Sequence, residues 1–274
     1  MIKWILLVML IVGVSSFAPR PLSWVAIGDS ITYLNDHTNE TGNRITKGYM
    51  TRVVEQLPNI SFVNQGHNGW TSAGIAKAID SLGLVKADVY SVFLGTNDWW
   101  HGVPVGSMQD YLGNTGNGTV YGSFRIIINK LHVLNKAAKI ILITPMQRSD
   151  FVYINNKKNN AWGSYKPKNG QELKEVVAAI DSIGHYEHAE VVDLYHKKGM
   201  SVENLVKFKR LKDPQTGEYK NYPYPKYATI PFDPEKDEYP YPVDAIDVTY
   251  DGLHPSDKGY TMIADLLVEI LRKY

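Results

Sequence analysis

The chain has 274 residues, of which 44% are hydrophobic and 21% are charged, a composition typical of a globular protein with a sizeable core. Its 29 lysines and arginines nearly balance its 28 aspartates and glutamates, so the charge gives no reason to expect nucleic acid or an anionic membrane as a partner. The chain has no cysteine, which excludes disulfides, thiolate metal sites, a cysteine nucleophile and a lipoprotein anchor.

The first residues have the pattern of an export signal. Lys3 is followed by an uncharged, mostly apolar run over residues 4–14, and the small residues Ser15, Ser16 and Ala18 suit cleavage after Ser16 or after Ala18. This pattern predicts a secretory signal peptide over residues 1–18, with the mature protein in the bacterial periplasm or outside the cell. The alternative is an uncleaved anchor or a buried helix, but the run is shorter than the roughly 20 apolar residues of a spanning helix. We therefore expect no stable membrane insertion after cleavage.

Five short, β-branched and nearly uncharged runs follow, at residues 24–27, 60–64, 89–94, 140–143 and 191–194. Such runs are typical of strands buried on both faces of a parallel sheet. Apolar residues at helical spacing lie between or after them, at residues 75–82, 173–183 and 260–271. The alternation predicts a three-layer α/β/α sandwich, in one domain over residues 19–274.

Two stretches do not fit this alternation. Residues 113–122 are rich in glycine, asparagine and threonine and are predicted to form a loop. Residues 207–247 are rich in tyrosine and proline and exceed an ordinary connection in length. They are predicted to be either a functional insertion that acts as a lid or a surface excursion packed on the edge of the sheet.

The first candidate functional residue is Ser30, in Gly28-Asp29-Ser30, directly after the first predicted strand. A serine there lies at the carboxyl end of the sheet, where open α/β folds bind ligands, and at the amino end of a helix. The tripeptide alone is equally compatible with a plain turn.

Two further candidates follow the second and third predicted strands. Gly69 permits close approach of the backbone to a ligand and could present a backbone N–H. Asn97, in Gly95-Thr96-Asn97-Asp98, could donate its amide N–H to a developing oxyanion. The alternatives are a glycine-rich loop and a helix-capping turn.

Asp251 and His254 lie three residues apart, just before the last predicted helix. A carboxylate can fix the tautomer of an imidazole and stabilise its protonated form, while the imidazole acts as a base. The alternative is a capping loop with an exposed histidine. Together with Ser30, these residues would supply a nucleophile, its base and a group that orients the base.

These four blocks together resemble the GDSL, or SGNH-hydrolase, family of esterases and acylhydrolases, over nearly all of the mature chain. The resemblance implies Ser30 as the nucleophile, Asp251 and His254 as its acid and base, and an oxyanion hole formed by Ser30, Gly69 and Asn97. It also implies a flavodoxin-like sheet of order 2-1-3-4-5, hydrolysis through an acyl-serine intermediate, and neither a metal nor a cofactor.

The second block, Asn68-Gly69-Trp70-Thr71, departs from the Ser-Gly-Asp-Thr pattern common in that family, so Gly66 stays as an alternative to Gly69.

Four residues beside these blocks are candidates for binding substrate: Asp29, Trp70, Trp99 and Trp100. Flat aromatic surfaces suit the apolar faces of sugars and also acyl chains, whereas the alternative for each tryptophan is packing under a loop.

The expected partner is an acylated small molecule or polysaccharide. We favour an acetylated carbohydrate, because the protein is expected to be exported and the stretch over residues 207–247 is rich in tyrosine rather than in aliphatic residues. Three alternatives remain, namely a lipase or lysophospholipase-like activity on longer acyl chains, acyl transfer to a sugar, and a non-catalytic carbohydrate-binding protein on the same scaffold.

Overall fold

The computed structural model describes residues 20–274, so the predicted signal peptide over residues 1–18 lies outside the described residues. A five-stranded parallel sheet forms the centre, in the order β2-β1-β3-β4-β7. Its strands are β1 (Leu22–Gly28), β2 (Ile60–Gly66), β3 (Val89–Phe93), β4 (Lys139–Ile143) and β7 (Glu190–Val192). The five predicted strands and the predicted order 2-1-3-4-5 are therefore confirmed.

The register of the sheet brings three strand ends level with one another. Gly28, the last residue of β1, pairs with Gly66 of β2 and with Phe93 of β3. Because parallel strands end at one edge of the sheet, the loops that follow these residues meet there.

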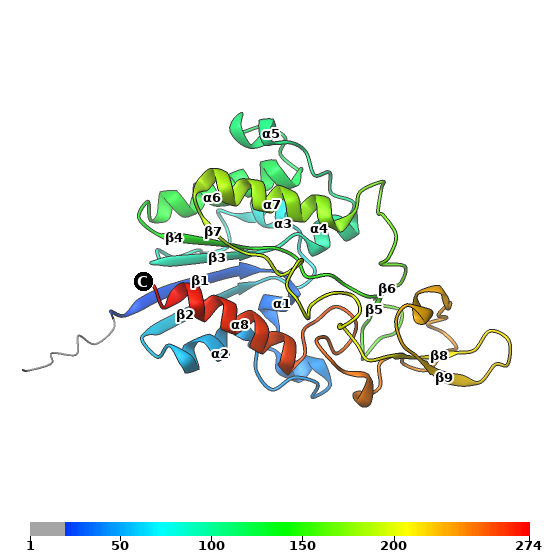
Figure 1. The fold of residues 1–274 in the computed structure, drawn as a ribbon. Helices are drawn as coiled ribbons and strands as arrows, with labels where there is room; N and C mark the ends of the chain where they lie inside the picture. Colours follow the sequence, from blue (N-terminus) through cyan, green and yellow to red (C-terminus); the bar gives the residue numbers. More distant parts are fainter. Residues whose placement is uncertain (1–19) are drawn as a thin grey trace, which may run out of the picture.

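Helices cover both faces of the sheet, which confirms the three-layer architecture (Figure 1). Helices α2 (Tyr49–Gln56) and α8 (Asp257–Leu271) pack together on one face, and α3 (Ser72–Ala78), α6 (Val120–Leu134) and α7 (Leu173–Glu187) lie on the other. Side chains of β1 alternate between the two layers, because successive residues of a strand point to opposite faces. Trp24 thus belongs to the α2/α8 core, and Val25 belongs to the core under α6 and α7.

The remaining helices are short. They are α1 (Ser30–Tyr33), α4 (Thr96–His101), α5 (Met108–Leu112) and the 3₁₀ helices η1 (Thr38–Thr41), η2 (Lys226–Thr229) and η3 (Val243–Ala245). None of the helices within residues 20–274 has the length and apolar character needed to cross a membrane.

The predicted loop over residues 113–122 is wrong at its end, because α6 already begins at Val120. The Thr119 hydroxyl accepts a 3.0 Å hydrogen bond from the Gly122 N–H and so caps the helix. Gly122 also lies against the backbone of Gly116, where a Cβ would meet the carbonyl oxygen at 2.3 Å. The glycine that suggested a loop is needed for close packing inside the first turn of a helix.

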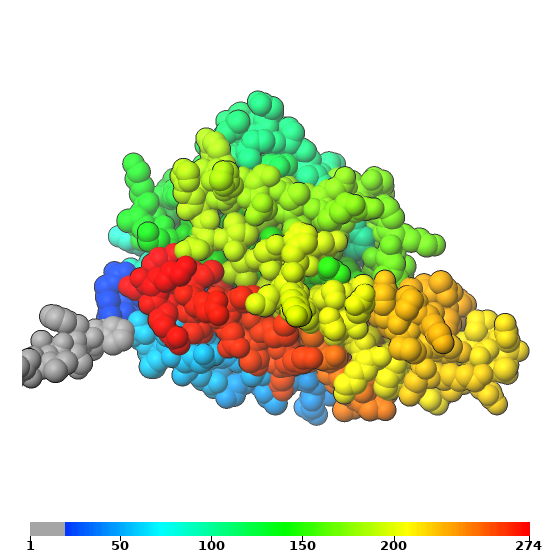
Figure 2. Space-filling view, in the orientation of Figure 1, coloured from blue at the N-terminus to red at the C-terminus, as the bar shows by residue number. Residues whose placement is uncertain are grey.

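The tyrosine-rich stretch over residues 207–247 projects from one end of the sheet, beside the segment that follows β4 (Figures 1 and 2). It contains the antiparallel hairpin of β8 (Lys209–Lys212) and β9 (Tyr219–Tyr222), and the neighbouring segment contains the two-residue strands β5 (Phe151–Val152) and β6 (Asn160–Ala161). Val152, Leu211 and Tyr227 belong to one small hydrophobic cluster, so the two excursions pack on each other.

Candidate active site

Ser30 lies at the junction between β1 and α1. Gly28 is required there, because a Cβ would lie 2.1 Å from Thr32 Oγ1. The Asp29 carboxylate accepts a 3.0 Å hydrogen bond from the Ile31 N–H and so caps the short helix. Ser30 is the first residue of α1, and its own N–H has no acceptor inside the helix.

Ser30, His254 and Asp251 form a continuous hydrogen-bonded chain. His254 Nε2 lies 2.9 Å from Ser30 Oγ, and His254 Nδ1 lies 2.7 Å from Asp251 Oδ2. Since an ionised carboxylate can only accept, Nδ1 donates to Asp251 and Nε2 is left as the acceptor for the serine hydroxyl. All three residues are buried, with 7%, 7% and 1% of their surfaces exposed, so these charges and dipoles act with little screening by water.

The imidazole is fixed by its own loop. Asp251 Oδ1 accepts hydrogen bonds from the backbone N–H groups of Leu253 (3.0 Å) and His254 (2.8 Å). Tyr250 stacks on the imidazole at 5.9 Å, and the Phe151 ring meets it edge-on at 5.1 Å. The carboxylate therefore orients both the backbone and the ring of the histidine.

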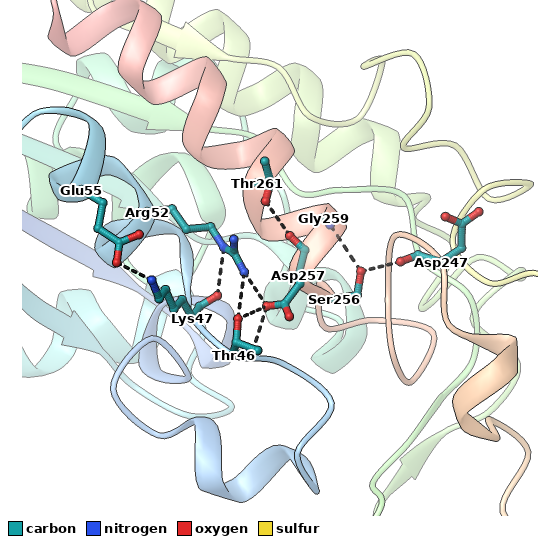
Figure 3. A network of polar contacts seen from close by, with 9 residues as sticks. All are labelled: Thr46, Lys47, Arg52, Glu55, Asp247, Ser256, Asp257, Gly259 and Thr261. Carbon is teal, nitrogen blue, oxygen red and sulfur yellow. Dashed lines mark hydrogen bonds and ion pairs between the residues drawn. The ribbon is translucent and has the colours of Figure 1, made fainter.

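The loop that carries His254 ends at the first turn of α8, which is tied to the segment before α2 (Figure 3). Asp257 accepts hydrogen bonds from Thr46 N (2.9 Å) and Thr46 Oγ1 (3.0 Å) and pairs with Arg52. Ser256 Oγ caps the helix at the Gly259 N–H and donates to the Asp247 carbonyl. The position of His254 is thus set by contacts made a few residues further along the chain.

Gly69 lies in the same cleft as Ser30 and His254. Its backbone has a φ of 76°, a left-handed conformation that favours glycine. Gly66, the alternative, lies outside this cleft, and its N–H already donates to Asn64 Oδ1 at 2.8 Å. Of the two glycines, Gly69 is therefore the one that can offer an N–H to a ligand.

Asn97 is the third residue that lines the cleft as expected. Its Nδ2 lies 3.1 Å from the Trp70 carbonyl oxygen and 3.4 Å from Asp29 Oδ2. The neighbouring Asp98 is fully buried and accepts hydrogen bonds from the N–H and the hydroxyl of Ser72. These contacts hold the loops after β2 and β3 against each other.

The four candidate substrate-binding residues separate in the structure. Trp100 lines the cleft. Trp99 is buried, and its Nε1 donates to the Gln171 carbonyl at 3.0 Å, so it packs under a loop. Trp70 stacks on His67 outside the cleft, and Asp29 is a buried helix cap. We therefore retain only Trp100 as a candidate for contact with substrate.

Burial also changes the acidity of Asp29. Its carboxyl is buried, and desolvation raises its pKa to about 6, although the Ile31 N–H and the charge of His254 act to lower it. The carboxyl next to Ser30 in the chain thus titrates in a range where an exposed aspartate is fully ionised.

The cleft has a volume of about 320 Å³. Sequence reasoning missed one of its walls, which is built by Arg148, Phe151, Tyr153, Asn159 and Asn160. These residues follow β4, so they too start from the carboxyl end of a sheet strand. Their position after a predicted strand could have identified them as candidates for the site, but the stretch contains no recognisable sequence motif.

The stretch over residues 207–247 contributes no lining residue to this cleft. It packs behind the missed wall and supports it. Within residues 20–274, no group of three histidine, aspartate or glutamate side chains is arranged to hold a metal ion.

Comparisons with known proteins agree with this geometry. The family model described as "GDSL-like Lipase/Acylhydrolase family" matches residues 26–262. A crystal structure described as "a possible lipase from Chitinophaga pinensis DSM 2588" is 64% identical, covering 92% of this chain and 98% of that chain with a TM-score of 0.90.

Two more distant structures share the fold. A protein from Lactobacillus plantarum is 20% identical with a TM-score of 0.61, covering 94% of this chain and 99% of that chain. An acetyl xylan esterase is 17% identical with a TM-score of 0.52, covering 91% of this chain and 99% of that chain. No protein with a curated description matches significantly.

Proposed function

The chain belongs to the GDSL-like lipase/acylhydrolase family, and from this membership and the geometry of the cleft we propose that it is a serine esterase that removes small acyl groups, acetyl above all, from carbohydrate. Membership implies ester hydrolysis. The hydrogen-bonded chain from Ser30 through His254 to Asp251 is the observation that carries the assignment of the reacting residues.

In the proposed reaction, His254 Nε2 takes the proton from Ser30 Oγ as the oxygen attacks the ester carbonyl. Asp251 stabilises the imidazolium that forms and keeps the ring in its orientation. The N–H groups of Ser30 and Gly69 donate to the oxyanion, and the Asn97 amide donates to it in place of its long 3.4 Å contact with Asp29 Oδ2. His254 then protonates the leaving alcohol, and a water molecule, activated by the same imidazole, releases the acid and restores the serine.

The cleft supports a small and polar substrate. Its volume of about 320 Å³ lies at the low end of the range of ligand sites, which is roughly 300–1,000 Å³. Its lining includes Asn68, Tyr153, Asn159 and Asn160, side chains that donate to and accept from hydroxyl groups. A long acyl chain would instead need an extended apolar channel.

Export to the periplasm or the medium is part of the proposal, because the predicted signal peptide over residues 1–18 would direct it. Sequencing the amino terminus of the mature protein tests this part. An intact Met1 on the protein recovered from cells would contradict it.

The principal test compares the wild type with Ser30→Ala on p-nitrophenyl acetate. We expect the variant to lose roughly 10³-fold or more in kcat/KM, because it lacks the attacking oxygen. Ser81→Ala, an exposed serine near the end of α3, is the matched control and should keep full activity. Full activity of Ser30→Ala would contradict the proposal.

Two further measurements separate the alternatives. A fluorophosphonate should label the wild type and not Ser30→Ala, whereas a non-catalytic binding protein would not be labelled at all. A series of esters from acetate to palmitate should show the highest kcat/KM at acetate. A preference for palmitate would favour the lipase alternative.

A further inference from the structure

Arg148 occupies an unusual position beside the nucleophile. It lines the cleft that contains Ser30 and His254, and it also lines a second cleft of about 310 Å³ on its other side. Only 5% of its surface is exposed. The proposed reaction gives it no part, since neither the proton transfers nor the oxyanion contacts involve it.

Among residues 20–274 the guanidinium has aromatic neighbours but no carboxylate partner. Its Nε is buried without a hydrogen bond, and none of the ion pairs among these residues includes it, since Asp150 pairs with Lys209 and Asp251 with His254. Burial lowers its pKa to about 10, so it stays charged at neutral pH. An unpaired buried charge is costly, and a ligand that supplies the missing partner would remove that cost.

The nearest carboxylates are committed elsewhere. Asp150, Asp251 and Asp29 all attract the Arg148 charge from a distance. However, Asp150 pairs with Lys209 at 2.6 Å and Asp251 binds His254 at 2.7 Å, while Asp29 caps α1. Lys209, the other buried cation, is paired with a carboxylate. Arg148 differs from it in having none within the described part of the chain, and Arg148 is the one of the two that lines the cleft.

Two tryptophans and a lysine complete the surroundings. The Arg148 guanidinium carbon lies 5.5 Å from the ring centre of Trp99 and 5.2 Å from that of Trp100, distances at which a cation and an aromatic ring attract each other. Lys168 Nζ lies 3.4 Å from the Trp100 ring centre. Arg148 and Trp100 therefore line the cleft together, and Lys168 adds a second positive charge at the Trp100 ring without lining the cleft itself.

We propose that Arg148 is a specificity-determining residue that binds a carboxylate of the substrate, so that the preferred ester is carried by an acidic sugar of the uronic acid type. This inference rests on the proposed esterase function and names its substrate class. A guanidinium can bind a planar carboxylate through two parallel N–H donors. A singly charged group suits the site better than a phosphate, because the three nearby aspartates would repel a second negative charge.

The test compares two matched substrates, an O-acetylated methyl glucuronide and the same ester of methyl glucoside, with acetate release as the readout. We expect the wild type to prefer the glucuronide by roughly tenfold or more in kcat/KM, in line with a charge-assisted hydrogen bond. In Arg148→Gln this ratio should fall towards one, and in Arg148→Lys it should be intermediate. Arg20→Gln removes an exposed arginine near the opposite edge of the sheet and should leave the ratio unchanged.

The outcomes separate recognition from a structural role and from failure of the esterase proposal. If Arg148 only supported the fold, its variants would lose activity on both substrates equally. The ratio of kcat/KM between the glucuronide and the glucoside would then stay at the wild-type value, and this result would overturn the inference. No preference in the wild type would also overturn it while leaving esterase activity intact. Absence of hydrolysis of any ester, p-nitrophenyl acetate included, would instead contradict the proposed function itself.

A measurement on the wild type alone keeps the inference testable if the variants do not fold. Methyl glucuronide should inhibit hydrolysis of p-nitrophenyl acetate at lower concentration than methyl glucoside, and added salt should weaken that advantage. Equal inhibition by the two glycosides would contradict the inference. Stronger inhibition by glucose 6-phosphate than by methyl glucuronide would contradict the choice of a carboxylate.

Discussion

The buried carboxyl of Asp29 helps to position Ser30, but its burial disfavours the charged form of the carboxyl. It caps α1 and approaches the Asn97 amide, so it holds the serine turn and the loop after β3 in register. Burial raises its pKa to about 6. Between pH 4 and 6 the unfolded chain releases this proton while the folded protein retains it, so the contribution of Asp29 to stability falls as the pH rises through that window.

The variant Asp29→Asn tests this effect, because asparagine keeps the oxygen that caps α1 and removes the titration. The difference in unfolding free energy between variant and wild type should shift in favour of the variant by about 3 kcal/mol from below pH 4 to above pH 6. Urea unfolding across this range measures it. A difference that is independent of pH would contradict the assignment.

The first turn of α8 shows how an element positions a residue that lies outside it. Ser256 caps this helix and also holds the Asp247 carbonyl (Figure 3), and it follows His254 by two positions in the chain. The same turn is joined to the segment before α2 through Asp257. The imidazole therefore depends on the helix start as well as on Asp251.

Ser256→Ala should lower the unfolding free energy by about 1 kcal/mol, the usual cost of losing a helix cap, and kcat should fall with it because the histidine loop loosens. Thermal unfolding and ester hydrolysis measure the two effects. Ser182→Ala, which changes a partly exposed serine inside α7, is the matched control and should leave both unchanged. An unaltered midpoint and kcat for Ser256→Ala would show that the cap is dispensable.

At the scale of the whole molecule, one buried ion pair joins the stretch over residues 207–247 to the wall of the cleft. Lys209 Nζ lies 2.6 Å from Asp150 Oδ2 and is surrounded by aromatic rings, with Trp162 at 4.5 Å and Tyr227 at 4.3 Å from their centres. Asp150 also accepts hydrogen bonds from the Gly163 and Ser164 N–H groups. The stretch is therefore a support for the segment after β4 and not a cover over Ser30.

Lys209→Met should lower the unfolding free energy by about 3–5 kcal/mol, because it leaves the Asp150 carboxylate buried without its partner. The double variant Asp150→Asn/Lys209→Met should recover much of this loss, since asparagine keeps an acceptor and removes the charge. Urea unfolding of the single and double variants measures the coupling. Equal stability of the two would contradict the role of the pair.

The sequence by itself determined the five strands and the identity of the residues at the strand ends, whereas the strand order came from the resemblance to a known family. Short β-branched runs indicated buried strands, and parallel strands bring their carboxyl ends to one edge, so Ser30, Gly69 and Asn97 could be assigned to a common site from their positions. Asp251 and His254 were recognisable because they are neighbours in the chain. The predicted loop was wrong from Val120 onwards, where α6 begins. Gly122, one of the glycines that suggested a loop, instead allows close packing in the first turn of this helix.

Only the tertiary structure decided what surrounds that edge. Arg148 and Lys209 are both basic residues in irregular segments, and nothing local distinguishes them. Within residues 20–274, folding pairs Lys209 with Asp150 and leaves Arg148 in the cleft without a carboxylate partner. Trp99 and Trp100 are adjacent in the chain, yet one is buried and the other faces the cleft. Burial and pairing depend on contacts between segments far apart in the sequence, and those contacts determine which side chains surround Ser30.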